Sequence, residues 1–267
     1  MIIEELRRCC TRILIRVSSV ADLPLVFLRG LCALRGEFVD RRHMSKHLER
    51  DLAELQRDLM TLASSVEEAI HKAIKSLELR HHALAQQVID GDRQIDEDEN
   101  HVEEECLKML ALHQPVAVDL RRITAALKIN AELERMGDLA EDIAERAIHI
   151  AHLPAIPLPS KLQRMTDLTT SMVRQSLDAF VNLDVRLART VCRLDDEVDR
   201  YNNEIIDELI RLMRTSPDAV EPGLSMFSAI RHLERIADHA TNIAEDVVYL
   251  AEGEIIRHRP NAIENNL

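Results

Sequence analysis

The segments Leu133-Glu-Arg-Met-Gly-Asp138 and Leu233-Glu-Arg-Ile-Ala-Asp238 share four of six residues and stand 100 residues apart in a chain of 267 residues. A shift of 103 residues likewise aligns 84–109 with 187–212 in matching register. Self-similarity at a fixed spacing indicates a duplicated structural unit. The sequence therefore predicts the same fold used twice in tandem.

Glycine and proline are scarce, and their positions predict an all-α fold. No Gly or Pro occurs between Gly36 and Gly91 or between Pro159 and Pro217, stretches that are too long for strands. An apolar ladder with alternating steps of four and three residues begins after Met44, as is typical of helices packed side by side. Its members are Leu48, Leu52, Leu55, Leu59, Leu62, Val66, Ala69, Ala73 and Leu77.

The proline positions divide the chain into six long helices, because proline is tolerated in the first turn of a helix but not in its interior. Short connections make successive helices antiparallel, and each repeat is a three-helix unit. We expect a first repeat at 44–153, a second at 154–253 and a C-terminal tail at 254–267. The predicted helices lie at roughly 46–80, 82–112, 116–152, 159–182, 185–214 and 222–252.

The first 43 residues differ from the rest in charge. They hold eight Arg, no Lys and five acids, for a net charge of +3, whereas residues 44–267 carry a net charge of −16. This segment also has no counterpart in the repeat. We expect 1–43 to be an N-terminal extension that is dispensable for the fold, with Met44 as a possible start of the native protein.

The overall composition disfavours several classes of function. A net charge of −13 and an aromatic content of 2% argue against binding to nucleic acid or to an anionic membrane surface. No run of about 18 uncharged apolar residues is present, which argues against a transmembrane span. Five cysteines without a Cys-x-x-Cys motif are typical of reduced thiols, so a cytoplasmic location is expected.

Acidic residues recur at the same positions of both repeats. Glu134, Asp138 and Asp142 follow one another at intervals of four residues, and Glu234 and Asp238 repeat the pattern. Helical geometry places them nearly opposite the apolar stripe, in a surface row rather than in the core. Such a row is either a solvated acidic face or a site where a cation relieves the repulsion between carboxylates. Further polar rows occur on the preceding helix of each repeat, at Asp92, Asp96 and Asn100 and at Asp195, Asp199 and Asn203.

The two acidic motifs resemble the twin E-x-x-x-D signatures of the PhoU family of bacterial phosphate-uptake regulators. The resemblance extends to Gln-Gln-Val-Ile-Asp-Gly-Asp at 86–92, Glu-Glu-Glu-Cys at 103–106, Gln-Pro-Val-Ala-Val-Asp-Leu-Arg at 114–121 and Met-Ser-Lys-His-Leu at 44–48. It covers essentially all of 44–253. It implies two tandem three-helix bundles related by a pseudo-twofold axis.

The resemblance also implies a function. It predicts a non-enzymatic regulator that links the ATPase subunit of a phosphate ABC transporter to a two-component sensor histidine kinase and represses the phosphate-starvation regulon. It further implies a homodimer that reaches the membrane only through its protein partners. A multinuclear cluster of divalent or ferric ions (Fe, Zn, Mn or Mg) is implied at Glu134, Asp138, Asp142, Glu234 and Asp238.

The sequence departs from the family pattern at two positions. Asn242 stands where the third acid of the second row is expected, and Ala237 stands where a glycine matching Gly137 is expected. Because an amide oxygen is a neutral donor, the Asn242 substitution predicts a smaller or weaker second cluster.

Two alternatives to this interpretation are a ferritin-like di-iron protein and a metal-free helical adaptor. Di-iron chemistry needs inward Glu-x-x-His motifs on two helices, but Glu68 to His71 and Glu78 to His81 both fall on the first predicted helix. The ladder from Leu48 to Leu77 also fits a plain adaptor. No nucleophile motif or phosphate-binding glycine loop is present, so no catalytic residue is predicted.

Overall fold

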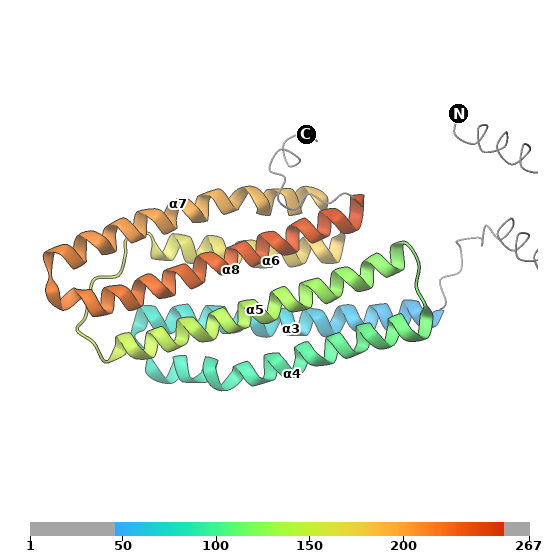
Figure 1. Ribbon diagram of the computed structural model, residues 1–267, viewed down its shortest axis with the longest axis horizontal. Helices are drawn as coiled ribbons and strands as arrows, with labels where there is room; N and C mark the ends of the chain where they lie inside the picture. The colour runs from blue at the N-terminus through green and yellow to red at the C-terminus, as the bar shows by residue number, and fades with distance from the viewer. Residues whose placement is uncertain (1–45, 254–267) are drawn as a thin grey trace, which may run out of the picture. The chain divides into compact units, whose positions relative to one another are not determined.

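The computed structural model describes residues 46–253. The predicted extension at 1–43 and the tail at 254–267 lie outside these residues. Within 46–253 the chain forms six long α-helices and one 3-10 turn, without a strand, which confirms the all-α prediction (Figure 1). They are α3 (Lys46–Leu79), α4 (His82–His113), α5 (Val118–Ala151), α6 (Leu162–Asn182), α7 (Val185–Thr215), η1 (Pro217–Ala219) and α8 (Val220–Glu252).

The helices form two groups of three, α3 to α5 and α6 to α8 (Figure 1). Helix α4 packs on α5 in the first group, while α6, α7 and α8 pack on one another in the second. Helix α3 lies against α4, where Asp51 Oδ2 is 3.0 Å from His113 Nε2. The two groups meet where α5 runs beside α8 (Figure 1). Arg174 of α6 adds an ion pair to Glu67 of α3.

Local capping explains where several helices begin and end. Asp184 Oδ1 accepts hydrogen bonds from the backbone N–H groups of Arg186 and Leu187, at 2.9 and 3.1 Å, which starts α7. Gly253, with φ of 75°, ends α8 in the left-handed conformation that glycine adopts without strain.

The predicted and observed helix boundaries differ most at the starts of three helices. Helix α5 begins at Val118 rather than 116, because Ala117 has φ of 50° and ψ of −106° and cannot be helical. Helix α6 begins at Leu162, not 159. Helix α8 begins two residues early, at Val220, since Pro222 fits the first turn, where its missing N–H is not needed.

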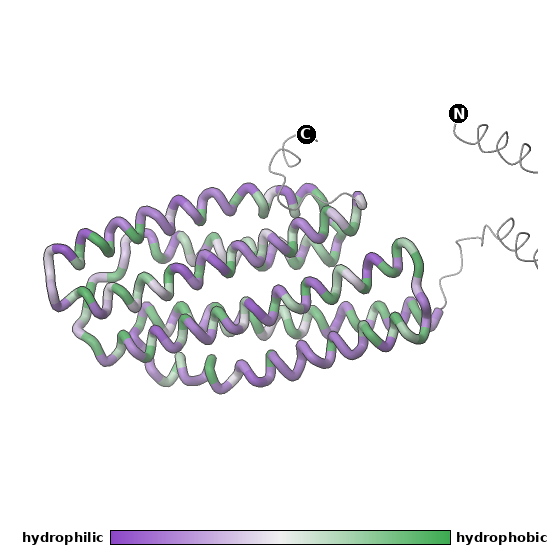
Figure 2. The backbone as a smooth tube through the Cα atoms, viewed as in Figure 1, coloured by the Kyte–Doolittle hydropathy of each residue, from purple (hydrophilic) through white to green (hydrophobic). Residues whose placement is uncertain are grey.

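The core consists of the apolar stripes of all six helices. Eight of the nine members of the predicted ladder on α3 are buried, and Leu52 is half-buried. Hydrophilic and hydrophobic residues alternate along each helix, so every helix presents both a polar and an apolar face (Figure 2). No helix within 46–253 is long and apolar enough to cross a membrane.

The core assignment predicts a large difference between two leucine substitutions. Leu59 of α3 is fully buried, whereas Leu112 at the end of α4 is 78% exposed. We expect Leu59→Ala to lower the free energy of unfolding by about 2–5 kcal/mol, because it leaves a cavity. Leu112→Ala is expected to change it by no more than about 0.5 kcal/mol. Urea denaturation of the two variants, followed by circular dichroism, measures both values, and equal losses would contradict the packing.

Candidate metal centre

The packing of α4 on α5 determines which polar side chains meet at the edge of their contact. Ile95 of α4 lies against Gly137 of α5, and Val88 of α4 and Met136 of α5 are also buried. Residues three and four apart share a helix face. Asp92 and Asp96 therefore lie one turn apart along the edge of α4 that borders α5.

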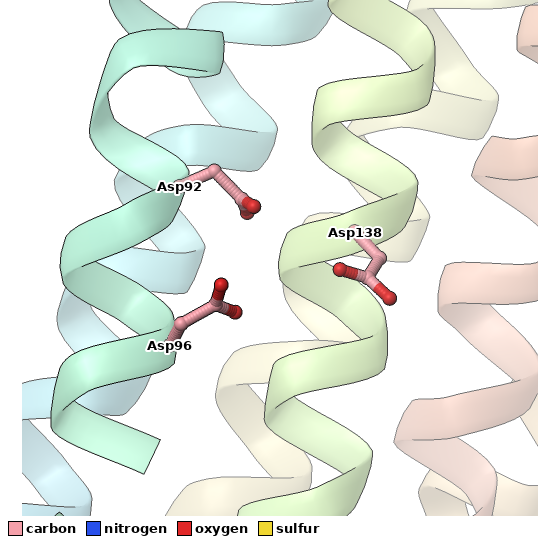
Figure 3. A group of neighbouring side chains, drawn as sticks. All are labelled: Asp92, Asp96 and Asp138. Atoms are coloured by element: carbon pink, nitrogen blue, oxygen red, sulfur yellow. The ribbon is translucent and has the colours of Figure 1, made fainter. Parts of the chain in front are cut away.

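Three carboxylates converge at this edge. Asp92 and Asp96 of α4 point toward Asp138 of α5 (Figure 3). Each offers one oxygen, and these three oxygens lie within 4.8 Å of one another. Asp92 is half-buried and the other two are exposed. We call Asp92, Asp96 and Asp138 the carboxylate cluster.

Burial and mutual repulsion raise the pKa values of this group. Burial raises the pKa of Asp92, and the charges of Asp96 and Asp138 raise it further. The pKa of Asp138 is raised by burial and by Asp96 and Asp142. Glu134 and Glu141 extend the acidic edge along α5, and burial followed by neighbouring carboxylates raises their pKa values also.

The donor set fits a hard or borderline cation. Within the described residues, none of the three cluster carboxylates forms an ion pair with a Lys, Arg or His side chain, so their repulsion is not relieved by the protein. Oxygens bound to one ion at about 2.0–2.5 Å can lie up to about 5 Å apart. All-carboxylate donors suit Mg, Mn, Fe and Zn. One cation could therefore contact all three side chains.

In the second repeat, Asp195 and Asp199 of α7 lie close enough to Asp238 of α8 for their charges to affect one another's pKa values, but within the described residues only the first-repeat group brings its oxygens within 4.8 Å. Burial, then the charges of Asp238 and Asp199, raise the pKa of Asp195 to about 6. Glu234 lies on the same side of α8 and is only 8% exposed. Its Oε1 accepts a hydrogen bond of 2.9 Å from Arg231. The predicted surface row is therefore partly buried. At Glu234, neighbouring residues cover a wider part of the helix surface than the apolar stripe alone indicates.

The structure divides the predicted residues of the first repeat between two places. Asp138 belongs to the carboxylate cluster and Glu134 lies beside it, half-buried. Asp142 instead faces the second repeat, where its Oδ2 is 3.6 Å from Nδ1 of His232. Asp92 and Asp96 were absent from the predicted set. Their spacing of four residues was the available signal, but whether the rows on α4 and α5 met could not be read from the sequence.

The corresponding third position of the second repeat also faces the other repeat. Asn242 donates its amide to Glu132 Oε2 of α5 at 3.0 Å. The same carboxylate oxygen lies 2.6 Å from His239 Nδ1. Glu132 and His232 are equivalent positions, 100 residues apart, as are Asp142 and Asn242. An acid therefore faces a histidine in one pair, and an amide donor faces an acid in the other.

The contact with Glu132 gives Asn242 a role other than that of the neutral metal donor expected from the sequence. Its side-chain amide is used by Glu132, which is 6% exposed. A carboxylate at position 242 would face Glu132 as a like charge in a region of low dielectric, which is costly. Asn242 thus joins His239 in contacting the Glu132 carboxylate at the contact between repeats.

The structure argues against the di-iron alternative. Glu68 and His71 are both exposed on α3, and Glu68 pairs with Lys72 at 2.7 Å rather than pointing inward. The prediction that the second motif lies on the same helix is wrong, because α3 ends at Leu79. His81 instead precedes α4 and accepts a hydrogen bond of 3.1 Å from the N–H of Leu84.

The pKa of Asp195 predicts a pH-dependent effect of its substitution in the metal-free protein. Above its folded pKa of about 6 the charged carboxylate destabilises the fold, and this penalty fades as the pH falls toward the unfolded value near 4. We expect Asp195→Asn to raise the free energy of unfolding by about 1–2 kcal/mol at about pH 7.5, allowing for partial solvent screening. Urea denaturation between about pH 7.5 and 4.5 measures the decline.

Asp207→Asn, an exposed substitution on the same helix, is the control for this series. If the increase in the free energy of unfolding caused by Asp195→Asn does not shrink as the pH falls, the raised pKa assigned to Asp195 is contradicted.

Comparisons with known proteins agree with the duplicated architecture. The sequence model of the PhoU domain matches residues 59–147 and 162–247, one match in each repeat. The phosphate-specific transport system accessory protein PhoU homolog of Pseudomonas putida is 38% identical over 217 residues, covering 81% of this chain and 85% of that protein.

Two crystal structures share the fold. PhoU from Pseudomonas aeruginosa is 37% identical, with a TM-score of 0.75 over 77% of this chain and 99% of that one. The phosphate transport system regulatory protein PhoU from Streptococcus pneumoniae is 30% identical, with a TM-score of 0.73 over 78% of this chain and 98% of that one. The chain, matched in both of its repeats, belongs to the PhoU family.

Proposed function

We propose that this protein is a non-enzymatic negative regulator of phosphate uptake, which links the ATPase subunit of a phosphate ABC transporter to a sensor histidine kinase. The observation that carries the proposal is the PhoU match in both repeats, together with relatives named as accessory or regulatory proteins of phosphate transport. In this proposal the protein is a cytoplasmic homodimer that reaches the membrane only through its partners and binds no nucleic acid.

The chemistry of the described residues supports action by contact rather than by catalysis. Burial raises the pKa of both Cys106 and Cys192 to about 12, so neither thiol is a ready nucleophile at neutral pH. The sequence has no phosphate-binding glycine loop, so any ATP hydrolysis belongs to the transporter. The protein itself contributes two pseudo-equivalent helical surfaces, one from each repeat.

We further propose that both acidic edges hold divalent or ferric ions as part of this surface. In the first repeat the carboxylate cluster binds the ion, with Glu134 as an additional ligand. In the second repeat Asp195, Asp199 and Asp238 bind it, with Glu234 beside them. A bound cation would neutralise carboxylates that otherwise repel one another across two helices, and would thereby hold the paired helices in one arrangement.

Removal of two ligands tests the metal proposal. We expect Glu134→Ala combined with Asp138→Ala to lower the metal content of protein purified without chelator, because the first repeat loses half of its proposed donors. Helicity by circular dichroism is expected to stay unchanged, since neither side chain packs in the core. Plasma emission spectrometry gives the stoichiometry.

Glu54→Ala combined with Asp58→Ala is the matched control, because these acids have the same spacing on α3 but lie outside the cluster. Equal metal content in both double variants would contradict the ligand assignment. A wild-type protein without metal would favour the metal-free adaptor.

Deletion of the gene tests the regulatory proposal. We expect the deletion strain to express phosphate-starvation genes in phosphate-rich medium, because the repressing contact with the sensor kinase is lost. An alkaline-phosphatase reporter measures the output, and complementation with this chain is expected to restore repression. A strain without a second copy of the gene that still represses normally in high phosphate would refute the proposal.

A further inference from the structure

We propose that Gly137 is a positioning residue, which sets the separation of α4 and α5 at the carboxylate cluster through its contact with Ile95. The inference rests on the proposed metal binding for its functional meaning. The packing that carries it is independent of any metal.

Gly137 occupies a position where even a methyl side chain would be crowded and its neighbour would have to shift by a few tenths of an ångström. It lies inside α5, directly before Asp138, and is buried. A Cβ atom at this position would lie 3.1 Å from Cγ2 and 3.5 Å from Cδ1 of Ile95. Glycine in a helix interior costs about 1 kcal/mol relative to alanine. The close approach of α4 and α5 at this position explains why glycine is found there in spite of this cost.

Ile95 has little freedom to move away from such a Cβ. It is 4% exposed on α4, and its β-branched side chain is stiff about χ1. The Cγ2 atom is attached directly to Cβ, so moving it requires a change of rotamer or a shift of the α4 backbone. Protein interiors are close-packed, which disfavours a new rotamer. A methyl group at position 137 would therefore displace α4 locally from α5.

A displacement of α4 acts directly on the carboxylate cluster. Asp92 and Asp96 flank Ile95 on α4, and Asp138 is the neighbour of Gly137 on α5. The same hypothetical Cβ would lie 3.7 Å from Asp92 Oδ1. The contact between Gly137 and Ile95 thus lies beneath the cluster. Ligand distances in well-formed metal sites lie within about 0.2 Å of their usual values, so a movement of a few tenths of an ångström would matter.

The second repeat satisfies the same constraint with a different pair of residues. Ala237 corresponds to Gly137 and Val198 corresponds to Ile95, and both are fully buried. Val198 keeps both Cγ atoms of isoleucine and lacks only Cδ1, and the space that Cδ1 would fill lets the shorter side chain turn about χ1 and move Cγ2 away from the added methyl group on α8. The total side-chain volume of the pair is thereby kept, and volume-conserving exchanges are the best tolerated in cores. This exchange accounts for the unexpected alanine at position 237.

The test compares full-length variants in which Asp199→Asn and Asp238→Asn silence the second repeat. In this background we would examine Gly137→Ala, the double change Gly137→Ala with Ile95→Val, and Gly91→Ala. Gly91 is the matched control, because it too is a helical glycine directly before a cluster carboxylate, here Asp92 of α4, but a Cβ there meets nothing within 4 Å. The double change recreates in the first repeat the combination found in the second.

The first measurement is Mn²⁺ binding by titration calorimetry. We expect Gly137→Ala to weaken binding about tenfold or more, as is usual when the support of a metal ligand is lost. Gly91→Ala is expected to leave the Kd unchanged, and the double change to restore it to within about threefold of the background protein. Equal binding by Gly137→Ala and Gly91→Ala would overturn the positioning role.

The second measurement needs no metal. Crystal structures of the metal-free proteins are expected to show a larger Cα separation between positions 95 and 137 in Gly137→Ala, and a restored separation in the double variant. An unchanged separation would overturn the inference whatever the binding results. Absence of Mn²⁺ binding by the parent protein would instead count against the proposed metal function, and the crystal structures would still decide the role of Gly137.

Discussion

The burial of the apolar stripes of paired helices is the constraint on which the remaining structure depends. Burying a side chain such as Ile95 or Met136 contributes about 1.5–3 kcal/mol. Repulsion between exposed like charges one turn apart costs only about 0.2–0.5 kcal/mol per pair. The free energy of apolar burial therefore exceeds the repulsion between the acids, and the acids at the edge of the contact are brought together despite their charge. Burial first, and then the charges of Asp96 and Asp142, raise the pKa of Asp138 as a consequence of this packing.

The two repeats are equivalent in backbone but not in chemistry, and the differences compensate one another. At the contact between α5 and α8, Asp142 faces His232, while the equivalent Asn242 donates to Glu132. Within each repeat, the pair Gly137 and Ile95 becomes Ala237 and Val198. In both cases a change on one helix is matched by a change on its neighbour. The two repeats thus pack in the same way with different, mutually compatible residue pairs at these contacts.

The number and order of the helices could be predicted from the sequence, because helical periodicity and proline positions are properties of short stretches of the chain. The six predicted ranges agree with α3 to α8 to within three residues at each end. The largest differences arise at local features, such as the positive φ of Ala117, which no pattern of apolar residues records. The depth of Glu234 was missed for a similar reason, because burial on a helix depends on how many neighbours surround it.

The sequence by itself determined that this is a duplicated helical protein with acidic motifs at equivalent positions, since each of these features is a matter of spacing along one chain. Only the tertiary structure decided which acids meet. Asp138 joins Asp92 and Asp96 of another helix, whereas Asp142, one turn further along α5, faces His232 across the repeat contact. Residues four apart lie on the same side of a helix but differ by about 40° in direction. Each can therefore border a different neighbouring helix, and that neighbour is set by the packing of whole helices, which no local pattern encodes.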